Sequence, residues 1–246
     1  MDQPGTFQLI PNLIARRGCR LPAIAHALAM FMMAAALLML SPRMACAQAS
    51  GNFSDSGTFE IRSAGQLVGT EKFRIARNGA WWESHAELSL KAGDATLEEK
   101  ATLRLAATMR PDDYLREQKS PIVASLAVRF GEKETSLVAT SGKESAERVY
   151  FLQPGFLIIL DTNFFHHYTF LLRQYTRSQG GEQPFNVFIP QEALPGTVNL
   201  IYVEKNNGQE HWKVTTDELE LDIVANENGA IQKISIPEAG VEITRK

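Results

Sequence analysis

Two adjacent histidines, His166 and His167, are the residues best suited by type to bind a metal or to move protons. Neighbours in a helix point about 100° apart, so both rings cannot ligate one metal as histidines spaced four residues apart do. Two further histidines, His85 and His211, are remote in the sequence. We therefore predict no bound metal and no cofactor, and we place His166 on a helix surface.

Two pairs of carboxylates, Glu98-Glu99 and Asp112-Asp113, are candidates for acid–base catalysis. Adjacent residues of a strand face opposite sides of a sheet, and Asp112-Asp113 follow Pro111 in a pattern typical of a turn. The sequence has no serine nucleophile elbow, no phosphate-binding glycine loop and no zinc protease signature. These observations favour a non-catalytic protein. A hydrolase or isomerase remains an alternative if scattered histidines and carboxylates converge in the fold.

Residues 1–47 have the three parts of a signal peptide. Three arginines at positions 16, 17 and 20 precede an apolar run from about Leu21 to Leu40, and Ala45-Cys46-Ala47 offers a small-x-small cleavage site. Cleavage after Ala47 would leave one domain, residues 48–246. The sequence thus predicts a periplasmic or secreted protein that touches the membrane only transiently, during export.

Three other interpretations of this leader remain open. Roughly 20 apolar residues suffice to span a bilayer, so the segment could stay as an uncleaved anchor. Cys46 suggests a lipoprotein, but Arg43 stands where such a signal needs an aliphatic residue. The pair Arg16-Arg17 resembles a twin-arginine signal without its usual flanking residues.

Removal of the leader also changes the composition. Both cysteines of the chain, Cys19 and Cys46, lie within it, so the exported domain would have no disulfide and no thiol chemistry. The leader carries four arginines and a single acid, so the exported domain is more acidic than the whole chain, whose formal net charge is −3. A negative charge repels nucleic acid and anionic lipid surfaces, and we expect no nucleic-acid partner.

Beyond the leader, apolar residues alternate with polar ones, the period of a β-strand with one buried face. The clearest case is Leu219 to Ile223, in which acidic residues separate the apolar ones. Turn signals such as Asn78-Gly79, Ser141-Gly142 and Asn228-Gly229 recur every ten to fifteen residues. We predict a mainly β fold in which an antiparallel meander of about 10–12 strands forms a curved sheet or half-barrel.

One segment departs from this alternation. Its apolar residues fall on one stripe of a 3.6-residue helix: Phe164, Phe165, Tyr168, Leu171, Leu172 and Tyr175. Asp161 or Thr162 is placed to cap the start, and Gly180-Gly181 lies beyond the end. We predict one substantial amphipathic helix at about 161–175.

Aromatic residues concentrate around this helix. Such stripes usually pack into a core, but a curved sheet and a helix can also enclose an apolar ligand cavity. For that case the residues predicted to line the cavity are Trp82, Phe156, Phe164, Phe165 and Tyr168.

The segment Gly57-Thr58-Phe59-Glu60-Ile61 and the later Gly65 to Glu71 resemble the start of uncharacterised exported bacterial β proteins. With a long meander and a late helix, residues 57–244 are similar in pattern to the half-barrel of the lipoprotein-localisation carriers LolA and LolB. This resemblance implies a curved sheet around a helical plug, with an apolar interior for acyl chains. It brings no functional motif, and fold analogy alone assigns no function.

Two functions are therefore predicted. The first is a non-catalytic periplasmic protein that binds a lipid or another apolar ligand inside the half-barrel. The second is a structural or interaction module of the cell envelope, without a ligand cavity, that holds another envelope protein. A carrier needs an enclosed cavity, whereas a module needs an exposed surface on a filled core.

Overall fold

The computed structural model describes residues 53–152, 157–217 and 219–246. The predicted signal peptide and its predicted cleavage site lie outside these residues, as does Phe156. The elements are β1 (Ser54–Ser63), β2 (Gln66–Asn78), β3 (Trp81–Ala92), β4 (Ala95–Ala106), β5 (Pro111–Ser120), β6 (Ala124–Phe130), β7 (Thr135–Ser141), β8 (Glu144–Tyr150), β9 (Leu157–Ile159), η2 (Phe165–His167), α1 (Tyr168–Gln174), β10 (Glu182–Ile189), β11 (Leu194–Asn206), β12 (Gln209–Thr215), β13 (Glu220–Asn226), β14 (Ile231–Ile236), η3 (Pro237–Ala239) and β15 (Val241–Arg245).

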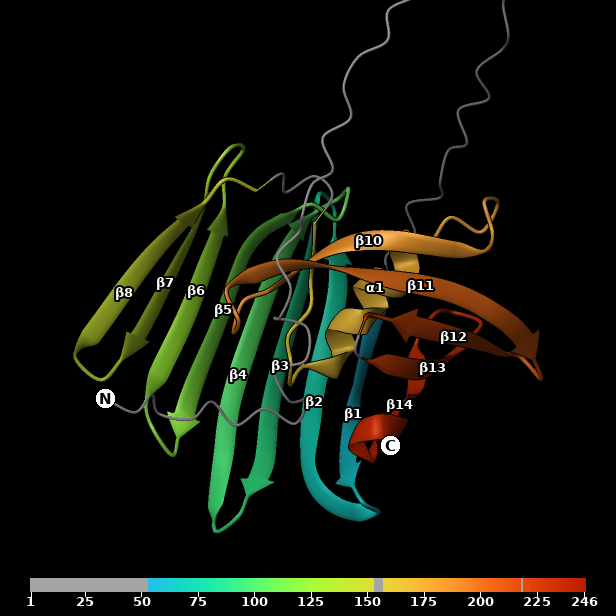
Figure 1. Ribbon diagram of the computed structural model, residues 1–246, viewed down its shortest axis with the longest axis horizontal. Helices are drawn as coiled ribbons and strands as arrows, with labels where there is room; N and C mark the ends of the chain where they lie inside the picture. The colour runs from blue at the N-terminus through green and yellow to red at the C-terminus, as the bar shows by residue number, and fades with distance from the viewer. Residues whose placement is uncertain (1–52, 153–156, 218) are drawn as a thin grey trace, which may run out of the picture. The chain divides into compact units, whose positions relative to one another are not determined.

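The fifteen strands form one sheet that is not closed into a barrel. Strands β8 to β1 lie side by side in reverse chain order, β1 pairs with β15, and β15 to β9 continue the sheet. Neighbours pair antiparallel throughout except β9, which runs parallel to β10. The predicted mainly β, antiparallel class is confirmed. The two edges of the sheet are β8, which Figure 1 shows, and β9.

Alternation decides which side chains face the core. In β4, Leu97, Ala101, Leu103 and Leu105 are buried, while Glu98 and Arg104 between them are exposed. The pairing register shifts at five places along the sheet, for example between Tyr202 and Glu204. Such bulges add local twist and bend the strands, which lets one sheet face wrap around a central segment.

That central segment is residues 160–175, which we call the plug. Trp82 of β3 contacts Phe170 with ring centroids 6.3 Å apart, and Trp212 of β12 contacts Tyr175 at 5.2 Å. The plug therefore packs against both halves of the same sheet face, as Figure 1 shows for α1 between β1–β3 and β10–β13. The sheet is curved around it, in agreement with the predicted half-barrel.

The helix is shorter than predicted. It comprises a 3₁₀ turn, η2, followed by α1, and therefore spans 165–174 instead of 161–175. No side chain caps it, because the Asp161 carboxylate accepts the Asn163 N–H at 2.8 Å and binds partners on the sheet. Residues 161–172 are buried on every side, so the helix is enclosed in the core and is not amphipathic.

Two further expectations need correction. The described residues form fifteen strands instead of ten to twelve. One reason is that every side chain of β8 is exposed or half-buried, so this strand lacks the apolar alternation that reveals the others. Asp112 and Asp113 do not form a turn. They begin β5, and both accept hydrogen bonds of 2.6 Å from Arg104 of β4. The turn precedes them, where Met109 has a φ of 65°.

Candidate functional site

Polar side chains lie buried between the sheet and the start of the plug. We call them the buried network: Glu71, Ser84, Glu99, Tyr114, Arg116, Asp161, Asn163, His166 and Gln191. Five come from β2, β3, β4 and β5, three from the plug and one from the loop after β10. They are the residues of the fold with the chemistry to form a site.

Glu71 of β2 is the centre of the first half of this network. Its carboxylate accepts the backbone N–H of Phe165 at 2.8 Å and that of His166 at 3.4 Å, and it is hydrogen-bonded to His166 Nδ1. The other ring nitrogen, His166 Nε2, lies 3.1 Å from Ser84 Oγ of β3. All three side chains have an exposed fraction of 0%. His166 is therefore in the core, and its predicted helix-surface position is wrong.

The hydrogen bonds link Ser84 to His166 and His166 to Glu71, as in the catalytic triad of a serine hydrolase. Two observations argue against catalysis. Ser84 is fully buried, so a substrate cannot reach its hydroxyl in this conformation. The histidine belongs to the plug, whereas the serine and the glutamate belong to the sheet. A movement of the plug that uncovered Ser84 would also carry His166 away from it. We interpret the three residues as the attachment of the plug to the sheet.

The second half of the network attaches the residues before the helix. Asp161 accepts hydrogen bonds from the Tyr114 hydroxyl and from the Gln191 amide. Arg116 forms a buried ion pair with Glu99, and the Asn163 amide donates to the other Glu99 oxygen at 3.4 Å. Since buried polar groups cost free energy unless they are paired, this arrangement specifies one position for the plug.

Burial controls the charges in the network. It raises the pKa of Glu71 to about 8, against the opposing effect of the Phe165 and His166 N–H donors. It lowers the pKa of His166 to about 3. The pair therefore holds one proton near neutral pH. Burial also raises the pKa of Glu99. For Arg116 burial acts to lower the pKa, but Asp161 and Glu99 outweigh it and raise the value, so the guanidinium stays charged.

His167 differs from its neighbour. Its ring is fully buried, 4.3 Å from the His166 ring between centroids, and neither ring nitrogen has a hydrogen-bond partner among the described residues. Burial lowers its pKa well below the ordinary value, so it is a neutral aromatic ring that packs near Tyr114 and Phe170. Within the described residues, no group of three or more His, Cys, Asp or Glu side chains is placed to hold a metal ion.

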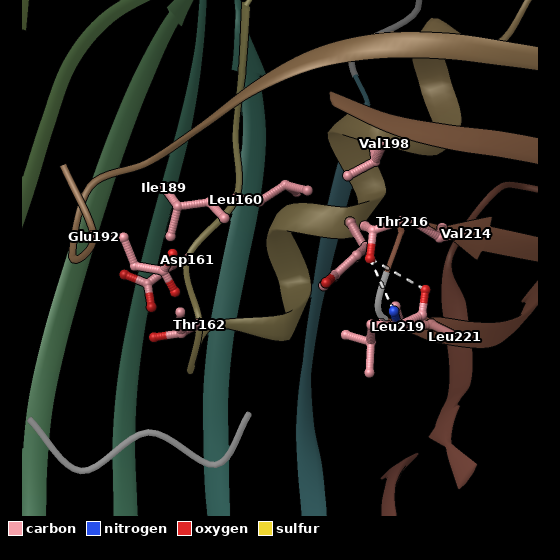
Figure 2. A pocket seen from close by; sticks show the side chains of 11 residues that line it. Leu160, Asp161, Thr162, Ile189, Glu192, Val198, Val214, Thr216, Leu219 and Leu221 are labelled. Carbon is pink, nitrogen blue, oxygen red and sulfur yellow. Dashed lines mark hydrogen bonds between the residues drawn. The ribbon is translucent and has the colours of Figure 1, made fainter. Parts of the chain in front are cut away.

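A small cavity borders the plug. Its volume is about 30 Å³, and Tyr168, Leu160, Val198, Val214 and Leu221 supply much of its apolar lining. Figure 2 shows Asp161, Thr162 and Glu192 on one side of the helix and Val198, Val214, Leu219 and Leu221 on the other. A cavity of this size holds about one water molecule, whereas ligand pockets usually measure roughly 300–1,000 Å³.

Four of the five residues predicted to line a ligand cavity fall within the described range. Trp82, Phe164, Phe165 and Tyr168 have exposed fractions of 3%, 0%, 1% and 6% and belong to the hydrophobic core. Of these, only Tyr168 borders the small cavity, and Phe156 lies outside the described residues. The aromatic side chains fill the concave face of the sheet themselves.

No protein-family model, curated protein or solved structure matches this chain. The resemblance to exported carriers therefore stays an expectation about architecture, and the site must be judged on its own geometry.

Most of the buried network was not predicted from the sequence, although the alternation contains a signal for it. Glu71 occupies an inward position between Gly69 and Phe73, and Glu99 an inward position between Leu97 and Ala101. A carboxylate on the apolar face of a strand must find a buried partner. Glu99 is paired with Arg116 of the neighbouring strand, but the donors from the plug lie about 65–95 positions away, so the sequence indicates that a donor is needed without identifying it.

The other two candidate histidines, His85 and His211, do not contribute to a site. His85 is exposed, with Nδ1 3.3 Å from Thr102 Oγ1, and His211 lies half-buried in β12. Neither is brought into the buried network. Among the described residues, no helix is long and apolar enough to cross a membrane.

The edge strand β8 is the second candidate site. Within the described part of the chain it pairs only with β7, and the register joins Ser141 to Glu144 across Gly142-Lys143. Gly142 has a φ of 59°, as the first central residue of a two-residue type II′ hairpin requires. In such a hairpin the flanking pair is hydrogen-bonded, and hydrogen-bonded pairs then alternate along the ladder. Residues 144, 146, 148 and 150 thus bond to β7, and 145, 147 and 149 direct their N–H and C=O groups away from the sheet.

Proposed function

We propose that this chain is an exported, non-catalytic protein of the cell envelope that acts as an interaction module and holds a partner protein through the edge of β8. The observation that carries the proposal is that the core face of the sheet is filled, whereas the outer edge of β8 has no paired strand among the described residues. The core side of the sheet is occupied by the plug and its aromatic residues. All seven residues of β8 are exposed or half-buried.

The edge of β8 has the properties of a binding strand. It is a regular strand of seven residues whose outward N–H and C=O groups offer hydrogen bonds to an added strand. Val149 at its end is 52% exposed, Phe151 just beyond it is 81% exposed, and Val123 near the β7–β8 turn is 71% exposed. Backbone pairing supplies affinity in this mode, and these side chains would supply selectivity.

The buried network supports a module with a fixed shape. Three buried carboxylates, Glu71, Glu99 and Asp161, hold the plug against the sheet through specific donors. Each donor would lose its partner if the plug moved, and an unpaired buried polar group costs about 1–3 kcal/mol. Because the core is rigid, the edge strand is already ordered before the partner binds, so binding does not cost the conformational entropy of ordering that strand.

The edge can be tested by photo-crosslinking in cells that export the chain. A benzoylphenylalanine at Ser145, whose backbone faces outward, is expected to form a covalent adduct with the bound partner. The substitution Glu147→Pro should abolish the adduct, because proline removes one outward N–H and leaves the bonds to β7 intact. The same probe at Asp222, exposed in the middle of the sheet on β13, serves as the control and should give no adduct.

Two results would contradict the proposal. One is the absence of any adduct at Ser145. The other is an adduct that forms equally well in the Glu147→Pro variant, provided that the variant unfolds at the same temperature as the unmodified chain.

Carriage of an apolar or lipid-like ligand is the second candidate function. One observation favours it: Thr162 and Glu192 also line the small apolar cavity beside Tyr168, and Thr162 Oγ1 and Glu192 Oε2 have no hydrogen-bond partner among the described residues. An acyl chain would fit only if the plug left the sheet and broke the buried network. The carrier function therefore requires a lipid to provide the free energy of that opening, at about 0.8 kcal/mol per buried methylene.

A further inference from the structure

The charged residues of β8 form no ion pair with any of the described residues. Among the described residues Glu144 and Arg148 form no ion pair, although both lie on the exposed edge strand. They are four residues apart with Ala146 midway, so all three side chains are on the same face of the sheet. Charges on an edge strand usually prevent pairing with other chains. Here a negative and a positive charge stand at equal distances on either side of a small residue.

That arrangement is complementary to itself. Two copies of β8 related by a two-fold axis through Ala146 run antiparallel, and Glu144 of each copy then faces Arg148 of the other. The axis places Ser145 opposite Glu147 of the second copy, and both residues direct their backbone groups outward, as a hydrogen-bonded pair requires. Ala146 faces Ala146 in a non-hydrogen-bonded pair, in which Cα atoms approach to about 4.5 Å and small side chains fit.

We propose that the partner of the β8 edge is a second copy of this chain, joined in this register into one continuous sheet. This inference rests on the proposed function, because it names the partner of the same edge. The two Glu144–Arg148 pairs and the backbone bonds of Ser145 and Glu147 hold the dimer together.

Other registers are less favourable. A shift that overlaps the whole of β8 with itself places Glu147 against Glu147, and the next shift places Arg148 against Arg148. Parallel pairing in register sets every charge against its own kind. Like charges directly opposite in a sheet destabilise the pair. The charges that favour the Ala146-centred register therefore disfavour these other registers. This limits the association of further copies in alternative registers.

Charge exchange tests this register directly. Sedimentation equilibrium of the purified exported chain should give a dimer mass at tens of micromolar. Glu144→Arg places two arginines against each other at both ends of the interface, and Arg148→Glu does the same with two glutamates. Each single variant should weaken the dimer by about tenfold or more.

Two further samples should restore it. The double variant Glu144→Arg/Arg148→Glu exchanges the charges and recovers the complementary pairs. An equimolar mixture of the two single variants should form mixed dimers, because every arginine then meets a glutamate. Neither substitution touches a core residue, so unfolding temperatures should stay close to that of the unmodified chain.

The outcomes separate this inference from the proposed function. A monomeric chain that still forms the Ser145 adduct with another protein overturns the homodimer and leaves the module intact. A monomeric chain with no adduct overturns both. A dimer that the single variants do not weaken uses another surface and overturns the proposed register.

Discussion

Replacing Glu71 by leucine is expected to lower the free energy of unfolding by about 4 kcal/mol, one of the two largest effects that we predict for a single substitution. The side chain is fully buried and is the acceptor for the backbone N–H groups of Phe165 and His166. Leucine has a similar volume but leaves these donors and His166 Nδ1 without a partner. The loss is measured by urea unfolding followed by tryptophan fluorescence.

Glu71→Gln is the matched control. The glutamine amide has the shape of the protonated carboxyl group, can accept the Phe165 N–H and can donate to His166 Nδ1. Its cost should stay below about 1.5 kcal/mol at pH 6. If leucine and glutamine had the same small cost, Glu71 would not anchor the plug.

The pH dependence of these variants follows from the two pKa values. Above pH 6.5 the unfolded chain has lost the protons of both Glu71 and His166, whereas the folded pair keeps one until the pH reaches about 8, the raised pKa of Glu71. The folded state binds more protons in this window, so its stability falls as the pH rises. We expect Glu71→Gln to gain about 2 kcal/mol relative to the unmodified chain between pH 6.5 and 8.

At acid pH the dependence of stability on pH has the opposite sign. Below pH 4.5 the unfolded chain binds protons at both residues, whereas His166 in the folded state stays neutral down to its lowered pKa of about 3. Stability then falls as the pH falls. A difference in stability between the two proteins that stays constant from pH 6.5 to pH 8 would contradict the shared proton.

Phe165→Ala is the second substitution with a large expected effect, a loss of about 3–5 kcal/mol in the free energy of unfolding. Phe165 is 1% exposed in the hydrophobic core, at the start of η2. Truncation removes buried apolar area and leaves a cavity where the plug meets the sheet. Calorimetry of the exported chain gives the change as a shift of the unfolding transition.

Phe151→Ala is the control for this prediction. Phe151 is 81% exposed, so its loss should change the stability by less than about 0.5 kcal/mol. A Phe165→Ala variant as stable as the Phe151→Ala variant would show that Phe165 contributes little to the packing of the plug.

Much of the fold could be predicted from alternation alone. The inward row of β4, from Leu97 to Leu105, and the turn signals at Asn78-Gly79 and Asn228-Gly229 indicate an antiparallel sheet before any coordinates are known. The signal is reliable because one sheet face is buried along most of its length. Where the face is open, as in β8, the pattern disappears and the strand escapes notice.

The helix boundaries and the polar site could not be predicted in the same way. Asp161 has the type and position of a helix cap, but a distant tyrosine, Tyr114, and a distant amide, Gln191, bind its carboxylate instead. The sequence around His166 predicts a surface position, because it does not show that Glu71 and Ser84 face the ring. The helix propensity of a local segment contains no information about hydrogen-bond partners that only the tertiary fold brings close.

These contacts also determine which function the geometry favours. A carrier must open its interior, and here opening would break the bonds of Glu71, Glu99 and Asp161 at the same time. A module needs only a stable core and an accessible strand. The free edge of β8 and its self-complementary charges satisfy that requirement without any rearrangement.

The most direct test of this account is the lipid content of the protein. The chain is extracted gently from cells that produce it, analysed by native mass spectrometry and titrated with cis-parinaric acid, a fluorescent fatty acid. We expect a mass that corresponds to protein alone and no saturable increase in fluorescence. One lipid molecule per chain, displaced by the fatty acid, would contradict the claim that the plug fills the sheet and would establish the chain as a carrier.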